Sequence, residues 1–113
     1  DPVIITVITG EDFAANVILD ALDFVALLPP ESVTTQGNQN ALTNFLGQAI
    51  AAIQVDDIER ALFKIDQALE RTDGCVLRGE PDGNGPGRDW ITDCVDQVLV
   101  YAFLILAKEA LSL

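Results

Sequence analysis

Residues 89–111, DWITDCVDQVLVYAFLILAKEAL, decide the fold class of this chain. Their apolar residues recur at helical spacing on more than one side of the helix. One stripe consists of Ile91, Cys94, Val95, Val98, Ala102, Ile105 and Leu106, and the other side carries Leu99, Tyr101, Phe103 and Leu104. A helix that is apolar all round is either buried by its neighbours or faces another subunit. Its longest uncharged run, residues 98–107, is too short for a membrane span, which requires roughly 20 residues.

Three earlier segments also carry apolar residues at helical spacing. They are residues 11–28, about 40–53 and about 56–73. Asp56, followed by Glu59, resembles a capping box at the start of the third segment, and Gly74 is placed to end it. Short connections between consecutive helices favour antiparallel packing. We therefore predict an all-α domain over residues 11–113, an antiparallel bundle of about four helices.

The first ten residues differ from the rest and predict an extended N-terminal strand over residues 1–10. After Pro2 the sequence reads VIITVIT, and β-branched residues favour strands over helices. A lone strand leaves its backbone N–H and C=O groups without partners, and no other segment reads as a strand. The segment therefore ends a removed β-domain, lies along the bundle, or pairs with another chain by strand addition.

Composition restricts the partners and the compartment. The chain has 18 Asp and Glu against 6 Lys and Arg, and a net charge of −12 repels nucleic acid and anionic lipid. The chain has no Met and begins at Asp1, which indicates a removed leader or an excised piece of a longer chain. Two cysteines fit one disulfide formed in an oxidising compartment. Together these features favour a secreted or cell-surface protein.

Cys75 and Cys94 flank a long glycine-rich loop. A bond between them would hold that loop and clamp the third helix to the fourth. The alternative is a pair of free thiols with a catalytic or metal-binding role. The two cysteines do not form a CxxC pair, and the chain has no His to complete a zinc site or activate a thiolate. We predict a structural disulfide.

Residues 82–93, DGNGPGRDWITD, are similar to a 12-residue calcium loop. Asp82, Asn84 and Asp93 match acidic or amide ligand positions one, three and twelve. Pro86 and Asp89 depart from the pattern, because position five lacks a side-chain ligand and position eight is not apolar. The alternative is a glycine-rich turn with Asp89 capping the last helix. We therefore expect no required cofactor, and calcium is the one ion that the sequence leaves open.

Several short segments carry a family resemblance. They are LPPE at 28–31, ALTN at 41–44, ALFKI at 61–65, TDGC at 72–75, GEPD at 79–82 and DWITDC at 89–94, with Gln97 and Tyr101. They resemble the FIMAH-type helical modules appended to secreted or surface proteins of bacteria and archaea. The resemblance covers roughly residues 12–113. It implies an extracellular helical bundle with its two cysteines bonded, and it supplies no catalytic residues.

The sequence favours binding over catalysis. With no His, acid–base chemistry would fall to carboxylates, Lys or Tyr, and no base is placed to activate Ser32 or Ser112. We therefore predict a non-enzymatic, self-assembling extracellular subunit of a filament or surface layer, whose partner is a copy of itself or another surface protein. The expected interface residues are Val3, Ile4, Ile5, Val7, Ile8, Leu99 and Phe103. The alternatives are a module that docks a surface protein and a calcium-stabilised binding domain.

Overall fold

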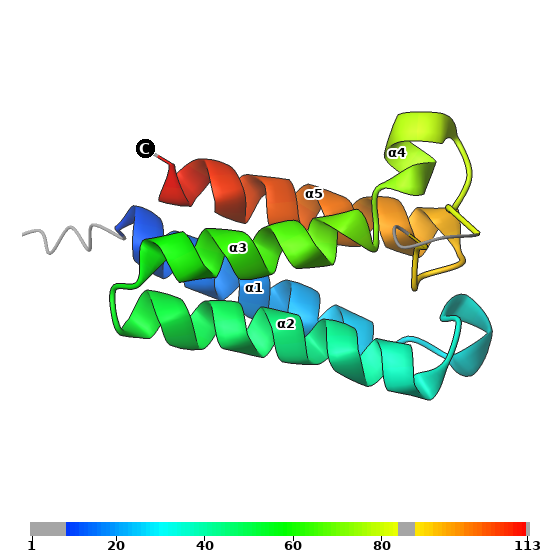
Figure 1. Cartoon of the computed structure of the whole chain (residues 1–113), viewed down its shortest axis with the longest axis horizontal. Coiled ribbons are helices and arrows are strands. Elements are labelled where there is room, and N and C mark those ends of the chain that lie inside the picture. The colour runs from blue at the N-terminus through cyan, green and yellow to red at the C-terminus, as the bar shows by residue number, and fades with distance from the viewer. Residues whose placement is uncertain (1–8, 84–87, 113) are drawn as a thin grey trace, which may run out of the picture.

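The computed structural model describes residues 9–83 and 88–112, and these residues form an all-helical fold (Figure 1). The elements are α1 (Gly10–Ala26), the 3-10 turn η1 (Pro30–Ser32), α2 (Gln36–Gln54), α3 (Ile58–Glu70), α4 (Gly74–Arg78) and α5 (Cys94–Leu111). The all-α class is confirmed, and the four long helices correspond to the four predicted ones. The predicted strand, with Val3, Ile4, Ile5, Val7 and Ile8, lies outside the described residues.

The four long helices run up and down in sequence order (Figure 1). α1 packs against α2 and α5, and α3 also packs against α2 and α5, so each helix has two neighbours. The start of α1, the α2–α3 connection and the end of α5 share one end of the bundle (Figure 1). The short helix α4 lies at the opposite end, next to the start of α5.

The core lies along the axis between the four helices, and each of them contributes to it. Its fully buried members include Ala14, Ile18, Ala21 and Val25 of α1, Leu42, Leu46 and Ala49 of α2, Ala61, Ile65 and Ala68 of α3, and Val100, Leu104 and Ala107 of α5. Each large apolar side chain buried in this way contributes roughly 1.5–3 kcal/mol. The alanines on all four helices allow the backbones to approach closely. No described helix is both long and apolar enough to cross a membrane.

Side-chain caps fix where each long helix begins. The oxygens of Thr9, Thr35, Asp57 and Asp93 accept from backbone N–H groups three residues later, at 3.0–3.1 Å. These bonds satisfy N–H groups that have no partner inside the helix.

The structure corrects four predicted boundaries. α2 begins at Gln36, earlier than predicted, because Thr35 caps a polar first turn. α3 begins after Asp57, and Asp56 has a positive φ of 63° outside the helix. α5 begins at Cys94 rather than at Asp89 or Trp90. Gly74 does not end α3, because it is the first residue of α4.

Two connections are joined at the end of the bundle that carries α4. Val33, after η1, forms an isolated antiparallel bridge with Ile91. The amide of Thr34 donates to the Trp90 carbonyl at 3.0 Å, and the amide of Thr92 donates to the Ser32 carbonyl at 2.8 Å. This pairing holds residues 90–92 in an extended path before α5, which is why the helix cannot begin there.

Candidate functional site

The outward side of α5 is the first candidate site. Val95, Val98, Leu99, Ala102 and Leu106 are all exposed, and this set is called the outer face of α5. Val95 is 80% exposed, Leu99 42% and Leu106 46%. Such a row of exposed apolar side chains on one helix is unfavourable in water, which makes it a candidate interaction surface.

The outer face lies opposite the side of α5 that enters the core. The buried residues of α5 are Gln97, Val100, Leu104, Ala107 and Leu111. With 3.6 residues per turn, Leu106 lies half a revolution from Gln97. Val95, Leu99, Ala102 and Leu106 are spaced by four, three and four residues, the spacing of a helix-pairing seam. α5 therefore carries one apolar stripe for its own core and a second that none of the described residues covers.

The two predicted interface residues of α5 have different positions. Leu99 lies on the outer face, whereas Phe103 is half-buried and packs against the core. The periodicity could not separate the two sides, because both are apolar. Charge adds a further feature: residues 97–107 contain no charged residue in a chain of net charge −12.

The start of α5 is tied to α4 by covalent and polar contacts. Cys75 and Cys94 form the predicted disulfide, with their Cα atoms 5.5 Å apart. The fully buried Gln97 accepts from the amide of Cys75 at 2.8 Å, and its Nε2 donates to the Ile91 carbonyl at 2.8 Å. α4 also exposes Val76 and Leu77 beside this junction. Gln97 was missed from the sequence, although it is the one polar residue in the buried stripe.

A buried carboxylate forms the centre of the same junction. Asp89 is 1% exposed, and its Oδ2 accepts from the amides of Gly74 at 3.0 Å and Asp82 at 2.9 Å. The Nε2 of Gln97 donates to the same oxygen at 3.1 Å. The other oxygen, Oδ1, is buried without a hydrogen-bond partner among the described residues. Asp89 therefore holds the loop rather than capping α5, and the cap of α5 is Asp93.

Three carboxylates converge near this junction. Oxygens of Asp73, Asp82 and Asp89 lie within 4.8 Å of one another. The guanidinium of Arg78 binds both carboxylate oxygens of Asp82, and its Nη2 lies 3.4 Å from Asp73 Oδ1. Burial raises the pKa of Asp73, and the charge of Asp89 raises it further, while Arg78 opposes the change. The Asp82 contact raises the pKa of Arg78 above its usual value.

The structure places the predicted calcium ligands in different surroundings. Asp82 belongs to the three-carboxylate group. Asp93 instead caps α5, where its Oδ1 accepts from the amide of Asp96 at 3.1 Å. Asn84 lies outside the described residues. Asp73 precedes the predicted loop by nine residues, so a pattern confined to residues 82–93 could not include it.

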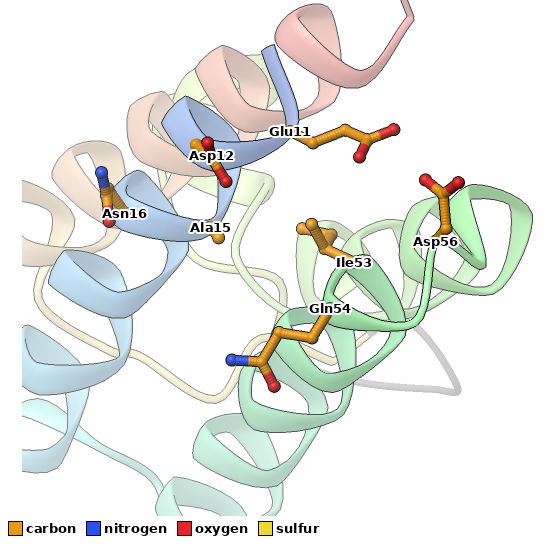
Figure 2. Close-up of a pocket in the computed structure, with 7 residues that line it drawn as sticks. All are labelled: Glu11, Asp12, Ala15, Asn16, Ile53, Gln54 and Asp56. Atoms are coloured by element: carbon orange, nitrogen blue, oxygen red, sulfur yellow. The ribbon is translucent and has the colours of Figure 1, made fainter. Parts of the chain in front are cut away.

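A separate acidic groove lies at the other end of the bundle (Figure 2). It has a volume of about 750 Å³ and is lined by Glu11, Asp12, Ala15, Asn16, Ile53, Gln54 and Asp56. The carboxylates of Glu11 and Asp56 face each other from α1 and the α2–α3 connection (Figure 2). A hydrogen bond to Asp56 raises the pKa of Glu11, as do desolvation and the charges of Asp56 and Asp12. These lining residues offer carboxylates and carboxamides but no hydroxyl or thiol nucleophile.

Comparison with known proteins leaves the chain without an assigned relative, since no family model, curated protein or solved structure matches it. The resemblance to FIMAH-type modules therefore stays a prediction from short segments.

Proposed function

We propose that this protein is a non-enzymatic, extracellular structural subunit that assembles with copies of itself through the outer face of α5. The observation that carries the proposal is the second apolar stripe of α5, which leaves Val95, Leu99 and Leu106 in water. Burying such side chains against a partner is favourable by about 25 cal/mol for each Å² removed from water. The disulfide supports an oxidising compartment such as the cell exterior.

A second copy of α5 is the partner that the charges favour. Two chains of net charge −12 repel each other across most of their surfaces. Residues 97–107 form an uncharged stretch that two copies can bring together without opposing like charges. Ala102 lies near the middle of the stripe, and its small side chain permits close approach of two helices. The spacing of the stripe suits packing of one helix against another.

The N-terminal segment is proposed as a second contact. Residues 3–8 lie outside the described residues, so this step rests on their strand-forming sequence alone. A subunit that pairs through α5 and also exchanges a strand with a different copy has two separate contacts. Two contacts on each subunit produce a filament or a layer, whereas one two-fold contact produces a dimer.

Size exclusion with light scattering on the full chain tests the proposal. We expect wild type to elute as a dimer or larger species, well above the chain mass of 12.1 kDa. Leu99→Gln combined with Leu106→Gln should give a smaller species than wild type, and a monomer once residues 1–8 are also removed, because it makes the stripe polar without changing net charge. Leu27→Gln with Val55→Gln is the matched control. It alters two residues that are 84% and 75% exposed elsewhere, and it should assemble as wild type does.

A deletion separates the two contacts. Removal of residues 1–8 retains Thr9, whose hydroxyl caps α1, so the helix should still form. We expect this shortened chain to stop at the dimer. A wild-type chain that stays monomeric at every concentration would contradict self-assembly. In that case the outer face of α5 would bind a different surface protein, and the chain would be a docking module, the alternative function.

A further inference from the structure

We propose that Asp73, Asp82 and Asp89 form a binding site for one Ca²⁺ ion at the junction of α4 and α5. This inference is independent of the proposed assembly. It also differs from the calcium loop predicted over residues 82–93, because it replaces Asn84 and Asp93 with Asp73 and Asp89.

One carboxylate oxygen of Asp89 is buried without a hydrogen-bond partner among the described residues. Three N–H groups already occupy Oδ2, and the side chain is 1% exposed. Oδ1 is nevertheless buried with no partner among the described residues. Leaving a buried polar atom unpaired is unfavourable, and more so when it carries charge. A cation within reach of Oδ1 and of the Asp73 and Asp82 carboxylates would supply the missing partner.

The carboxylate oxygens of Asp73, Asp82 and Asp89 have the spacing and the chemical type that Ca²⁺ requires. Two ligands on opposite sides of one Ca²⁺ lie roughly 5 Å apart, since each is 2.3–2.6 Å from the ion. The separations within 4.8 Å found here meet that limit. Carboxylate oxygens suit hard cations such as Ca²⁺. Softer metals lack their preferred ligands, because the chain has no His and both cysteines are bonded to each other.

The guanidinium of Arg78 contacts Asp82 and Asp73 and offsets part of the negative charge of the three carboxylates. A divalent cation that displaces Arg78 would take over that role. Arg78 is also half exposed, so its side chain can leave Asp82 when an ion binds. Arg78 is therefore a competitor of the cation, not a ligand.

The test is calorimetric titration of the full, chelator-treated chain with CaCl₂. We expect one Ca²⁺ per chain, and Asp73→Asn and Asp82→Asn should each weaken its affinity by about tenfold or more. Arg78→Gln should strengthen it, because the competing charge is removed. Asp93→Asn is the matched control, since Asn still caps α5, and its affinity should equal that of wild type. Asp89 is left intact, because its oxygen holds the fold through three N–H groups.

Terbium luminescence provides the second measurement. Tb³⁺ stands in for Ca²⁺, and Trp90, the one Trp in the chain, directly follows Asp89 and can sensitise its emission. We expect emission that Ca²⁺ displaces in wild type and that is reduced in Asp82→Asn. Circular dichroism checks that each variant is folded. The proposal is overturned if wild type binds no Ca²⁺ at millimolar concentration. It is also overturned if Asp73→Asn and Asp82→Asn keep wild-type affinity, or if Asp93→Asn weakens binding as much as they do.

Discussion

Gly74 shows how a single residue can be required by its surroundings. A Cβ built on it would lie 2.6 Å from both the Asp82 amide nitrogen and the Glu80 carbonyl oxygen, and would also collide with Asp89 Oδ2. Two of these neighbours are backbone atoms, so the loop cannot yield by rotating a side chain. The absence of a side chain at Gly74 is what lets the loop close over the buried carboxylate.

We predict that Gly74→Ala destabilises the protein by about 1–3 kcal/mol, the usual cost of forcing an extra group into a packed site. Gly47→Ala is the matched control, because a Cβ there would meet Leu22 Cδ1 at an ordinary 3.9 Å. That control should be stabilised by about 0.5–1 kcal/mol, since Gly is a poor helix residue. Urea unfolding followed by circular dichroism measures both. Equal effects of the two substitutions would contradict the steric argument.

The facing carboxylates of Glu11 and Asp56 predict a pH dependence. The raised pKa of Glu11 means that the folded chain binds a proton more tightly than the unfolded chain, whose Glu titrates near 4.5. Stability therefore falls as pH rises from about 4.5 through the raised value. Asp56→Asn removes the partner, and Asn tolerates the positive φ at this position.

We expect Asp56→Asn to be more stable than wild type at pH 7, with the difference vanishing below about pH 4. Thermal unfolding at a series of pH values tests this. Parallel curves for the two proteins from pH 4 to pH 8 would show that the pair has no effect on stability.

At the scale of elements, the disulfide links α4 to α5 and closes a loop of 19 residues. Closing a loop of this length stabilises the fold by about 3 kcal/mol through the entropy of the unfolded chain. Combined Cys75→Ala and Cys94→Ala substitution should cost about that much in urea unfolding. The Gln97 bond to Cys75 uses the backbone amide and survives the change. A loss below about 1 kcal/mol would mean that the polar junction alone holds the loop.

The sequence predicted the four long helices because their buried stripes follow helical spacing, as Leu42, Leu46, Ala49 and Ile53 do in α2. It missed the first turn of α2, because Gln36–Asn40 contains no apolar residue to reveal a period. It began α5 too early, because Ile91 fits the helical spacing although it lies in the bridge with Val33. The bridge between Val33 and Ile91 sets the start of α5, and the spacing of apolar residues along the sequence gives no sign of that bridge.

The candidate sites were predictable to different degrees. The disulfide followed from having two cysteines. The sequence revealed that α5 is apolar but not which of its sides faces water. Leu99 is exposed and Leu104 is buried, and the two leucines differ only in what packs against them. The carboxylate group joins Asp73 to Asp89 across 16 residues through the fold of the loop. A ligand pattern read along a continuous segment could not find it.

At the scale of the whole molecule, α5 differs from the other three long helices in the surfaces that it presents. Its inner stripe completes the core, and its outer face is the contact that we propose for a second copy. α2 lies diagonally across the bundle from α5, since α1 and α3 separate them. A contact made through α5 therefore leaves α2 at the far side of the assembly.

Assembly through the outer face of α5 is tested most directly by oxidative cross-linking of the Ala102→Cys variant, analysed on a non-reducing gel and by mass spectrometry. Ala102 lies near the middle of the stripe, so pairing of two α5 helices in either direction brings its two copies together. Ala51→Cys is the control, an exposed site on α2. We expect a rapid, specific dimer cross-link through residue 102 and not through residue 51. Equal, slow cross-linking of both variants would contradict assembly through the outer face of α5.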